Sequence, residues 1–452
     1  MIAKPARCGG AGLLALLLFA LALPAFAQTP VQSAPQASPG VRLGIHLGVA
    51  TCLGSNCHGA VDRPAGSRIK GNEYVIWSRS DKHHNAYKVL TEEPALRMAK
   101  ALGMPDAVHQ QLCLDCHADN VPVADRGPQF HIEDGVGCES CHGGASGWLG
   151  IHIAGATHQQ NVSAGMYATE QPLARAERCL SCHLGKGDRF VEHRIYGAGH
   201  PRLRFELDTF TAIQPAHFEV TPAYVQRKGR ITDMEVWGTG QAVSVALRMA
   251  ALADPKLAPH GLFPEFAHYD CQSCHHPYDP LHGPRSMVPG LPPGSVKFND
   301  ANVVMLQAAT ARTAPAASQT LGGEAATLDR ASSQDWGTIT RDAKPLEGTA
   351  SNLAPTLAKR DYSREEMRAI AASLIGLGLE EGGGRFAHAE QIAMGLGAIR
   401  SAMVSSGYLS DGQVQASGAA LESLNGAFPN EGSLRADAFV KGLRDLQRAL
   451  GQ

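Results

Sequence analysis

Four segments of the chain repeat one short pattern: a cysteine, two other residues, a second cysteine and then a histidine. Two thiols with this spacing can reach both vinyl groups of one porphyrin, and the histidine is then placed under the iron as its proximal ligand. In a chain of this composition, chance would give roughly 0.01 copies of the pattern. The four copies predict c-type haems at Cys113, Cys116 and His117; Cys138, Cys141 and His142; Cys179, Cys182 and His183; and Cys271, Cys274 and His275.

A related pair lies nearer the start of the chain. Cys52 and Cys57 have four residues between them, and His58 follows directly. Some multihaem cytochromes attach haem through this longer loop, so we expect a fifth haem here with His58 as its proximal ligand. The alternative is a disulfide between the two cysteines. The chain should carry haem c at five sites, and at four as a minimum.

Zinc sites and disulfides are the other common uses of cysteine pairs. A structural zinc ion needs two such pairs around it, and disulfides are the ordinary fate of cysteines in an exported chain. Neither use explains why a histidine follows every pair, whereas iron ligation does.

Further histidines offer ligands for the opposite face of each iron. All but one of the 20 histidines lie between residues 46 and 282, so the supply exceeds the need. Residues 74–90 have a helical pattern, in which a rigid backbone could aim His83 or His84 at an iron. Other candidates lie before or after an anchor: His46, His152, His193, His200 and His217. Two histidine ligands favour a low reduction potential, whereas a missing distal ligand leaves the iron open to substrate.

The first 27 residues have the organisation of a secretory signal peptide. Lys4 and Arg7 precede an apolar run over residues 11–23, and an A-x-A cleavage site ends at Ala27. The run is too short to span a membrane. We therefore expect cleavage after Ala27, export to the periplasm, and a flexible Pro/Ser-rich tether over residues 28–45.

The anchors divide the remaining chain into two parts. Residues 46–298 contain all of them and are predicted to form the multihaem domain, whereas residues 299–452 lack cysteine and are predicted to form a helical bundle. Residues 386–405 repeat apolar side chains with helical period, and a capping box starts another helix at Ser363. Residues 313–360, rich in Ala, Thr, Ser, Pro and Gly, are predicted to be an irregular linker. His388 is expected to be an ordinary side chain.

The composition also excludes some classes of protein. A net charge of −2 gives no reason to expect binding to nucleic acid or to an anionic membrane surface. Aromatic residues make up only 6% of the chain, which is low for a core of this size. Porphyrins are large, flat and apolar, and would supply the missing bulk.

Several stretches resemble the multihaem cytochromes of the cytochrome c-554 type: GVATCLGSNCHGA, WSRSDKHHNAY, CLDCH, GVGCESCHGGASGWL, CLSCHLGKGDRFVEHRIYGAGHPRLRFELDTF, QPAHF and DCQSCHHP. The resemblance covers about residues 46–300. It implies a mainly α fold with long loops around covalently bound haems, and electron transfer in the periplasm. It favours His83 over His84 as a distal ligand and makes His152, His193 and His200 plausible ones. The longer cysteine loop and the C-terminal region depart from the four-haem family pattern.

Three functions remain open. The first is an electron carrier with histidine on both faces of each iron, docking to a redox protein donor and acceptor. The second is an oxidoreductase with one open haem that acts on a small nitrogen or sulfur compound of the hydroxylamine, nitrite or tetrathionate class. The absence of any C-x-x-C-K segment weakens the version related to pentahaem nitrite reductases. The third is a structural role as a subunit of an extracellular filament or of a membrane-associated complex held through a partner, with the C-terminal helical bundle as the docking surface. No catalytic residue is assigned.

Overall fold

The computed structural model describes residues 44–62, 67, 69–187, 189–254, 265–275, 296–332, 334–430 and 432–451. The predicted signal peptide and residues 28–43 of the predicted tether lie outside the described residues.

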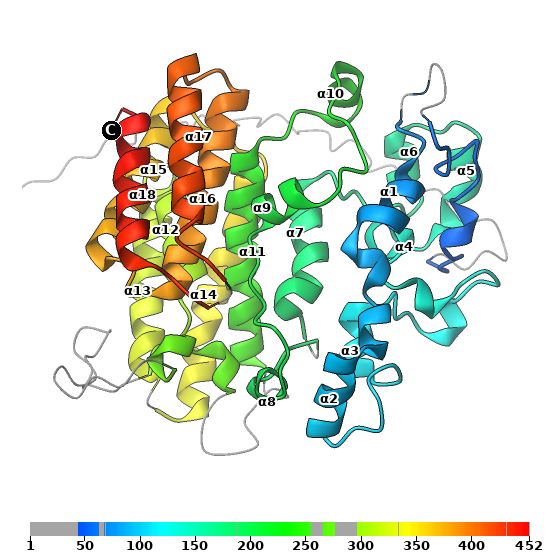
Figure 1. Ribbon diagram of the computed structural model, residues 1–452, viewed down its shortest axis with the longest axis horizontal. Helices are drawn as coiled ribbons and strands as arrows, with labels where there is room; N and C mark the ends of the chain where they lie inside the picture. Colours follow the sequence, from blue (N-terminus) through cyan, green and yellow to red (C-terminus); the bar gives the residue numbers. More distant parts are fainter. Residues whose placement is uncertain are drawn as a thin grey trace, which may run out of the picture. The chain divides into compact units, whose positions relative to one another are not determined.

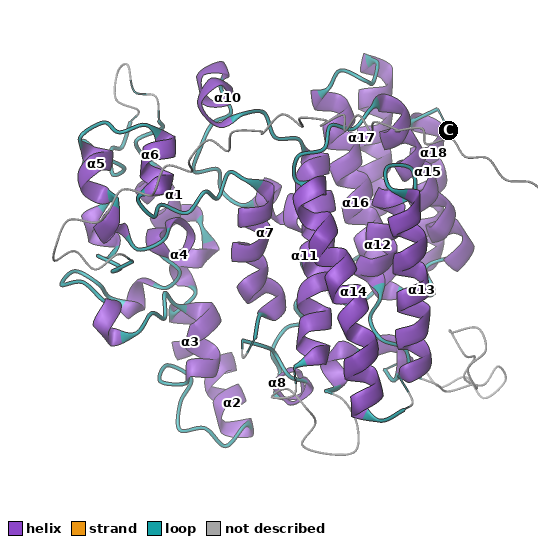
Figure 2. Ribbon diagram, turned by 180° about the vertical axis from the view of Figure 1, so that it is seen from behind, coloured by secondary structure: helices purple, strands orange, loops and turns teal. Residues whose placement is uncertain are grey.

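Helices dominate the described chain (Figure 2). Its only β-type pairings are isolated bridges, such as the one between His46 and Arg126. The prediction of a mainly α fold is therefore confirmed.

The part of the chain that carries the first four cysteine–histidine anchors consists of short helices joined by loops, shown in blue to green in Figure 1. A short helix can place a cysteine and the residue three positions later on one face, as the anchor chemistry requires. These helices are α1 (Glu73–Ser80), α2 (Glu93–Ala101), α3 (Gln111–His117), α4 (Cys138–His142), α5 (Leu149–Ile153), α6 (His158–Ser163), α7 (Pro172–Leu180), α8 (His193–Gly197), α9 (Leu207–Ile213) and α10 (Pro222–Lys228).

The longer helices follow and pack against one another (Figure 1). They are α11 (Asp233–Ala253), α12 (Ala301–Thr310), α13 (Pro315–Ala331), α14 (Trp336–Leu357), α15 (Arg364–Glu381), α16 (Phe386–Ser405), α17 (Asp411–Asn425) and α18 (Ala436–Ala449). The helix predicted over residues 386–405 is confirmed as α16, and the Ser363 capping box at the start of α15 is also confirmed.

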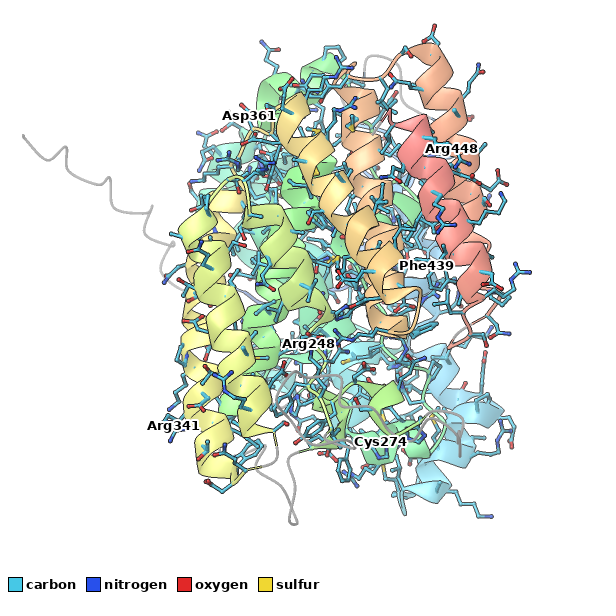
Figure 3. The ribbon with its side chains drawn as sticks, turned by 90° about the vertical axis from the view of Figure 1, so that its left-hand side faces the viewer. Arg248, Cys274, Arg341, Asp361, Phe439 and Arg448 are labelled. Atoms are coloured by element: carbon cyan, nitrogen blue, oxygen red, sulfur yellow. The ribbon has the colours of Figure 1, made fainter. Side chains whose placement is uncertain are left out.

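Helix α11 connects the two kinds of region. It contacts α7 and α9 among the short helices, and α12, α14 and α16 among the long ones. Close packing depends on glycine at two positions, because a Cβ at Gly240 would lie 2.7 Å from Leu207 and one at Gly395 would lie 2.9 Å from Trp237. The apolar core is consequently continuous, extending from Ala176 in α7 to Phe439 in α18 (Figure 3) and on to Leu450.

The irregular linker predicted over residues 313–360 is wrong, because α13 and α14 occupy most of it. Helix α14 even contains two internal prolines, Pro345 and Pro355. Its buried side chains nevertheless recur with helical period: Ile339, Ala343, Leu346, Ala350, Ala354 and Leu357. Tertiary packing of this stripe, in part against α11, overrides the weak local propensity that motivated the prediction.

Candidate haem sites

Four of the five proximal histidines predicted from the sequence face a second histidine. The ring centroids are 6.1 Å apart for His58 and His152, 6.0 Å for His183 and His83, 6.4 Å for His117 and His200, and 6.0 Å for His275 and His193. A metal–nitrogen bond of about 2 Å plus roughly 1 Å from nitrogen to ring centre gives about 6 Å between two rings that share one metal. Each pair therefore has the separation required to hold an iron between its imidazoles.

Hydrogen bonds to the backbone set the orientation of two of these rings. His117 Nδ1 lies 2.9 Å from the carbonyl oxygen of Ala86, and His200 Nδ1 lies 2.7 Å from that of Pro201. A carbonyl oxygen can only accept, so Nδ1 carries the proton in both rings. Nε2 is then left with a free lone pair, which is the form a metal ligand needs.

Carboxylates orient two more rings. His58 Nδ1 donates to Glu73 at 3.1 Å, and His83 Nδ1 donates to Asp81 at 2.9 Å. The bond to Glu73 raises the pKa of His58. Burial alone would raise the pKa of Asp81, but hydrogen bonds from His217, His83 and Gln214 hold it well below its ordinary value. A ligating histidine whose other nitrogen meets a carboxylate is a recurrent arrangement at metal sites, because the carboxylate fixes the ring and increases its basicity.

The segment that carries His83 differs from the single helix predicted over residues 74–90. Helix α1 ends at Ser80, Asp81 is extended with ψ 125°, and a short 3₁₀ turn, Lys82–Asn85, follows. The Asp81 side chain caps this turn by accepting from the backbone N–H of His83 at 3.0 Å. The break arises because the same carboxylate binds both the backbone and the ring of His83. His84 points elsewhere and packs edge-on against Trp77 at 4.5 Å.

His142 is the proximal histidine for which no ring partner is recorded among the described residues. Burial by the surrounding protein, followed by the charges of Lys228 and His217, lowers its pKa to about 4. Its side chain still keeps an exposed surface of the kind a porphyrin would cover. The influence of His217 on the pKa of His142 shows that His217 lies near it. The Nε2 atom of His217 is 3.0 Å from a carboxylate oxygen of Asp81.

His46, a predicted distal ligand, is not placed beside any proximal histidine in the described part of the chain. Its Nδ1 instead binds Asp119 at 2.7 Å. Burial alone would lower the pKa of His46, but this hydrogen bond raises it.

Neighbouring anchors touch through their cysteines. Cys52 and Cys138 are in side-chain contact, and Cys182 Sγ lies 3.6 Å from the carbonyl oxygen of Asp115, inside the second anchor. Cys141 is in turn close enough to Cys179 for the two thiols to influence each other's charge. These contacts bring the first anchor to the third, the third to the fourth, and the fourth to the second.

Helix α8 extends this series to the fifth anchor. It begins at His193, which faces His275, and it is followed within a few residues by His200, which faces His117. The five anchors are thus neighbours in the order first, third, fourth, second and fifth.

Glu139 links the first and third anchors, a role that sequence reasoning missed. It lies between the two cysteines of the third anchor and is buried. Its carboxylate accepts from three backbone N–H groups, those of Leu47 at 2.8 Å, Gly48 at 2.7 Å and Ala145 at 2.7 Å. The backbone that enters the first anchor is thereby held against the third. An acidic residue inside a pair of haem-binding cysteines was the available signal.

The region around the anchors also has the surface expected of a porphyrin cradle. Every large apolar side chain exposed in the described residues lies between Leu53 and Phe266, and none lies on the described helices α12 to α18. Some of the buried polar atoms without partners also lie here, among them Trp148 Nε1, His84 Nδ1 and both ring nitrogens of His268. All ten described cysteines are free thiols. Among the same residues, no group of three or more His, Cys, Asp or Glu side chains could hold a metal ion without a porphyrin. The residues present therefore fit haem.

A mainly helical chain with cysteine–histidine anchors and opposed imidazoles is a c-type cytochrome. Residues 52–143 match the family described as cytochrome c554 and c-prime. The match begins at the first cysteine of the longer pair, so that pair lies within the family region. It confirms the resemblance seen in the motifs for this part of the chain, which is similar to c-type cytochromes of the cytochrome c554 type and so supports the binding of haem c. No curated protein and no solved structure matches the chain. The described helices include none that is both long enough and apolar enough to cross a membrane.

Proposed function

We propose that the protein is a periplasmic pentahaem cytochrome that carries electrons between a redox protein donor and a redox protein acceptor. The observation that carries this proposal is the set of four imidazole pairs at about 6 Å. Haem bound at these sites supplies one-electron oxidation and reduction. Each pair of imidazoles would hold the iron of one haem, and such a site would have no room for a substrate.

The protein's own contribution is to hold the anchors in a fixed series. Glu139 and the contacts between cysteines hold the first, third, fourth and second anchors near one another, and α8 connects the second to the fifth. The cysteines at the two ends of the series, Cys57 in the first anchor and Cys274 in the fifth, are exposed. Exposed end sites suit the exchange of electrons with separate partners.

Export is part of this proposal. The apolar N-terminal run with its A-x-A site supports it, as do the cysteine–histidine anchors, because c-type haem is attached outside the cytoplasm. Cell fractionation and the mature N-terminal sequence test it. A chain that starts at Gln28 and is recovered with the periplasmic fraction is the expected result.

One observation favours a second function, an oxidoreductase with an open haem. His142 has no recorded ring partner among the described residues, and Lys228 and His217 lie near it. A cationic group beside an accessible axial position would attract a small anion such as nitrite. His217 is also a candidate sixth ligand for this site, and that arrangement would restore the carrier.

Electron paramagnetic resonance of the oxidised protein separates the two functions. Low-spin ferric signals alone support the carrier. A stoichiometric high-spin signal that changes when nitrite or hydroxylamine is added overturns the carrier in favour of the oxidoreductase. The His217→Ala variant completes the test: a new high-spin signal that appears only in the variant identifies His217 as the ligand opposite His142.

A further inference from the structure

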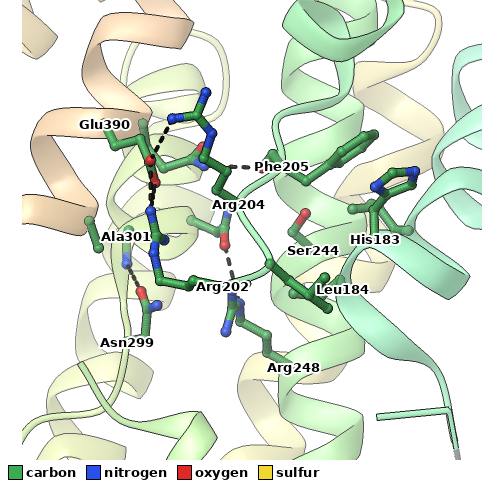
Figure 4. A pocket seen from close by; sticks show the side chains of 15 residues that line it. His183, Leu184, Arg202, Arg204, Phe205, Ser244, Arg248, Asn299, Ala301 and Glu390 are labelled. Atoms are coloured by element: carbon green, nitrogen blue, oxygen red, sulfur yellow. Dashed lines mark hydrogen bonds and ion pairs between the residues drawn. The ribbon is translucent and has the colours of Figure 1, made fainter. Parts of the chain in front are cut away.

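An arginine-rich pocket lies where the fourth anchor meets the long helices (Figure 4). His183 and Leu184 line one side of it, next to the cysteines of that anchor. The opposite sides come from the segment around Arg202 and Arg204, from α11 and from the start of α12. Figure 4 shows the side chains of Arg202 and Arg204 extending towards Glu390, with Arg248 on the other side of Arg202.

Positive charge exceeds negative charge in the pocket. Glu390 is the single acidic residue in its lining, against three arginines. Arg202 uses one nitrogen to bind both carboxylate oxygens of Glu390 at 2.7 Å, and Arg204 approaches the same carboxylate at 3.8 Å. The carboxylate of Glu390 is therefore already paired with Arg202 and Arg204, and it forms no ion pair with Arg248.

Arg248 is the pocket arginine that has no ion-pair partner among the described residues. It projects from α11, and its Nε donates to the side-chain oxygen of Asn302 at 3.3 Å. No described carboxylate lies within ion-pair distance of it. Burial lowers the pKa of Arg248, because removing a guanidinium from water disfavours its charged form. A half-buried guanidinium without an acidic partner among the described residues can bind an anion from outside the polypeptide.

The polar groups next to Arg248 cannot supply that anion. The Asn302 amide donates to Gln241 at 2.8 Å, and Gln241 donates to Gln391 at 3.1 Å. Gln391 in turn donates to the backbone oxygen of Phe205 at 3.1 Å. This chain of amides is neutral and internally satisfied, so it positions Arg248 without neutralising it.

A buried histidine without hydrogen-bond partners lies close by. His268 is only 4% exposed and has no hydrogen-bond partner at either ring nitrogen, while its ring stacks on Phe190 at 4.8 Å. It lies three residues before the fifth anchor and within the electrostatic influence of Arg248. Arg248 and Arg202 also influence Cys271 of that anchor. Arg248 and His268 thus lie between the fourth and fifth anchors.

We propose that this pocket binds one carboxylate or small oxyanion through the guanidinium of Arg248, with the source being a propionate of the haem at the fourth or fifth anchor. A guanidinium matches a planar carboxylate in shape and can donate two hydrogen bonds to it. Haem carries two such carboxylates, and the adjacent anchors would bring them to the pocket without loss of translational freedom. This inference rests on haem being attached at these anchors, as the proposed function requires.

The test uses the haem-loaded protein and the variant Arg248→Gln, which keeps an amide donor but removes the charge. The control is Arg341→Gln, because Arg341 is exposed on α14 (Figure 3) and pairs with Asp342 away from the anchors. Intact mass first establishes that each protein carries the same number of haems. A spectroelectrochemical titration then follows the reduction steps, and calorimetry follows binding of sulfate and acetate at constant ionic strength.

A propionate in the pocket predicts that Arg248→Gln shifts one or two reduction steps to lower potential, because a nearby positive charge favours the reduced site. Neither sulfate nor acetate should then bind to the wild type. Binding of sulfate or acetate at one site per chain, lost in Arg248→Gln, would identify a free anion as the source instead. The control should match the wild type in both measurements.

Identical reduction steps in Arg248→Gln and the wild type, with no anion binding by either, would overturn the proposal. If Arg248→Gln does not retain its haems, Arg248→Lys replaces it, since lysine keeps the charge without the planar fork. Potentials that stay near those of the wild type in Arg248→Lys are expected. If the wild type carries fewer than five haems, that result would count against the proposed pentahaem cytochrome and not against anion binding in the pocket.

Discussion

Replacing His388 by alanine should destabilise the folded protein by about 3 kcal/mol near pH 6. His388 lies in α16 and is 1% exposed. Its Nε2 binds Asp300 at 2.8 Å and its Nδ1 binds Glu381 at 2.9 Å. Each hydrogen bond to a charged group is worth roughly 1.5–3 kcal/mol, and the lower end applies because Asp300 keeps Lys297 at 2.8 Å and Arg385 as partners.

The pH dependence of this loss follows from the direction of the pKa shift. Burial alone would lower the pKa of His388, but its bonds to Asp300 and Glu381 raise it above the ordinary value of 6.5. A group with a raised folded pKa stabilises the protein fully below its unfolded pKa and loses that contribution as pH rises through the folded pKa. The difference in unfolding free energy between wild type and His388→Ala should therefore be largest at about pH 6 and shrink towards alkaline pH.

Measurements from about pH 6 to alkaline pH are informative because the pKa of Asp300, the partner of His388, shifts in the opposite direction. Burial alone would raise the pKa of Asp300, but bonds with His388 and the charges of Arg385 and Lys297 lower it. Its contribution is present above the unfolded pKa of 3.8 and is lost in acid as pH falls through the folded pKa. Comparison from about pH 6 upwards isolates the histidine.

Urea denaturation of the haem-loaded protein, followed by far-ultraviolet circular dichroism, measures the effect. His109→Ala is the matched control, since His109 is an exposed histidine that also binds a carboxylate, Asp106 at 3.0 Å. The control should leave the unfolding free energy unchanged. A loss below about 1 kcal/mol for His388→Ala, or a loss that grows with pH, would refute the reasoning.

Three further predictions concern the anchors. His200→Ala should convert one low-spin haem to high-spin without loss of haem, measured by electron paramagnetic resonance; an unchanged spectrum would remove His200 from the ligands. The intact mass of the mature chain should show five haem increments, and replacing Cys52 and Cys57 by serine should remove one; four increments in the wild type would leave those cysteines as a disulfide. Glu139→Gln should cost about 2–4 kcal/mol in urea denaturation, because the amide nitrogen must face backbone N–H groups that the carboxylate accepted, whereas a cost near zero would show that the three bonds are dispensable.

Residues at the start of α16, close to His388, also contact the fifth anchor. Arg385 lies 4.0 Å from Asp270, and the backbone N–H of Phe386 donates to Gln272 at 2.9 Å. Asp270 and Gln272 flank and occupy the fifth anchor, so the start of α16 holds that segment directly. Nothing in the sequence assigned His388 a special role, whereas the structure gives it a structural one through its bonds to Asp300 and Glu381.

Local chemistry was readable from the sequence. A cysteine pair followed by histidine needs only a few consecutive residues, so each anchor is identified without knowledge of the fold. The helix at 386–405 and the capping box at Ser363 are likewise encoded within one or two turns. The stretch around α14 was not readable, because its helix depends on burying a stripe against α11 and its composition argues for a loop.

The pairing of imidazoles was decided by the tertiary structure alone. His58 meets a histidine from a distant helix, and His275 meets one from far earlier in the chain, so sequence distance says nothing about either pair. From the sequence, both His46 and His152 were candidate distal ligands, and the fold places His152 beside a proximal ring while His46 binds Asp119. An anchor is covalent and local, whereas a distal ligand is whichever side chain the packed fold brings to the other face of the iron.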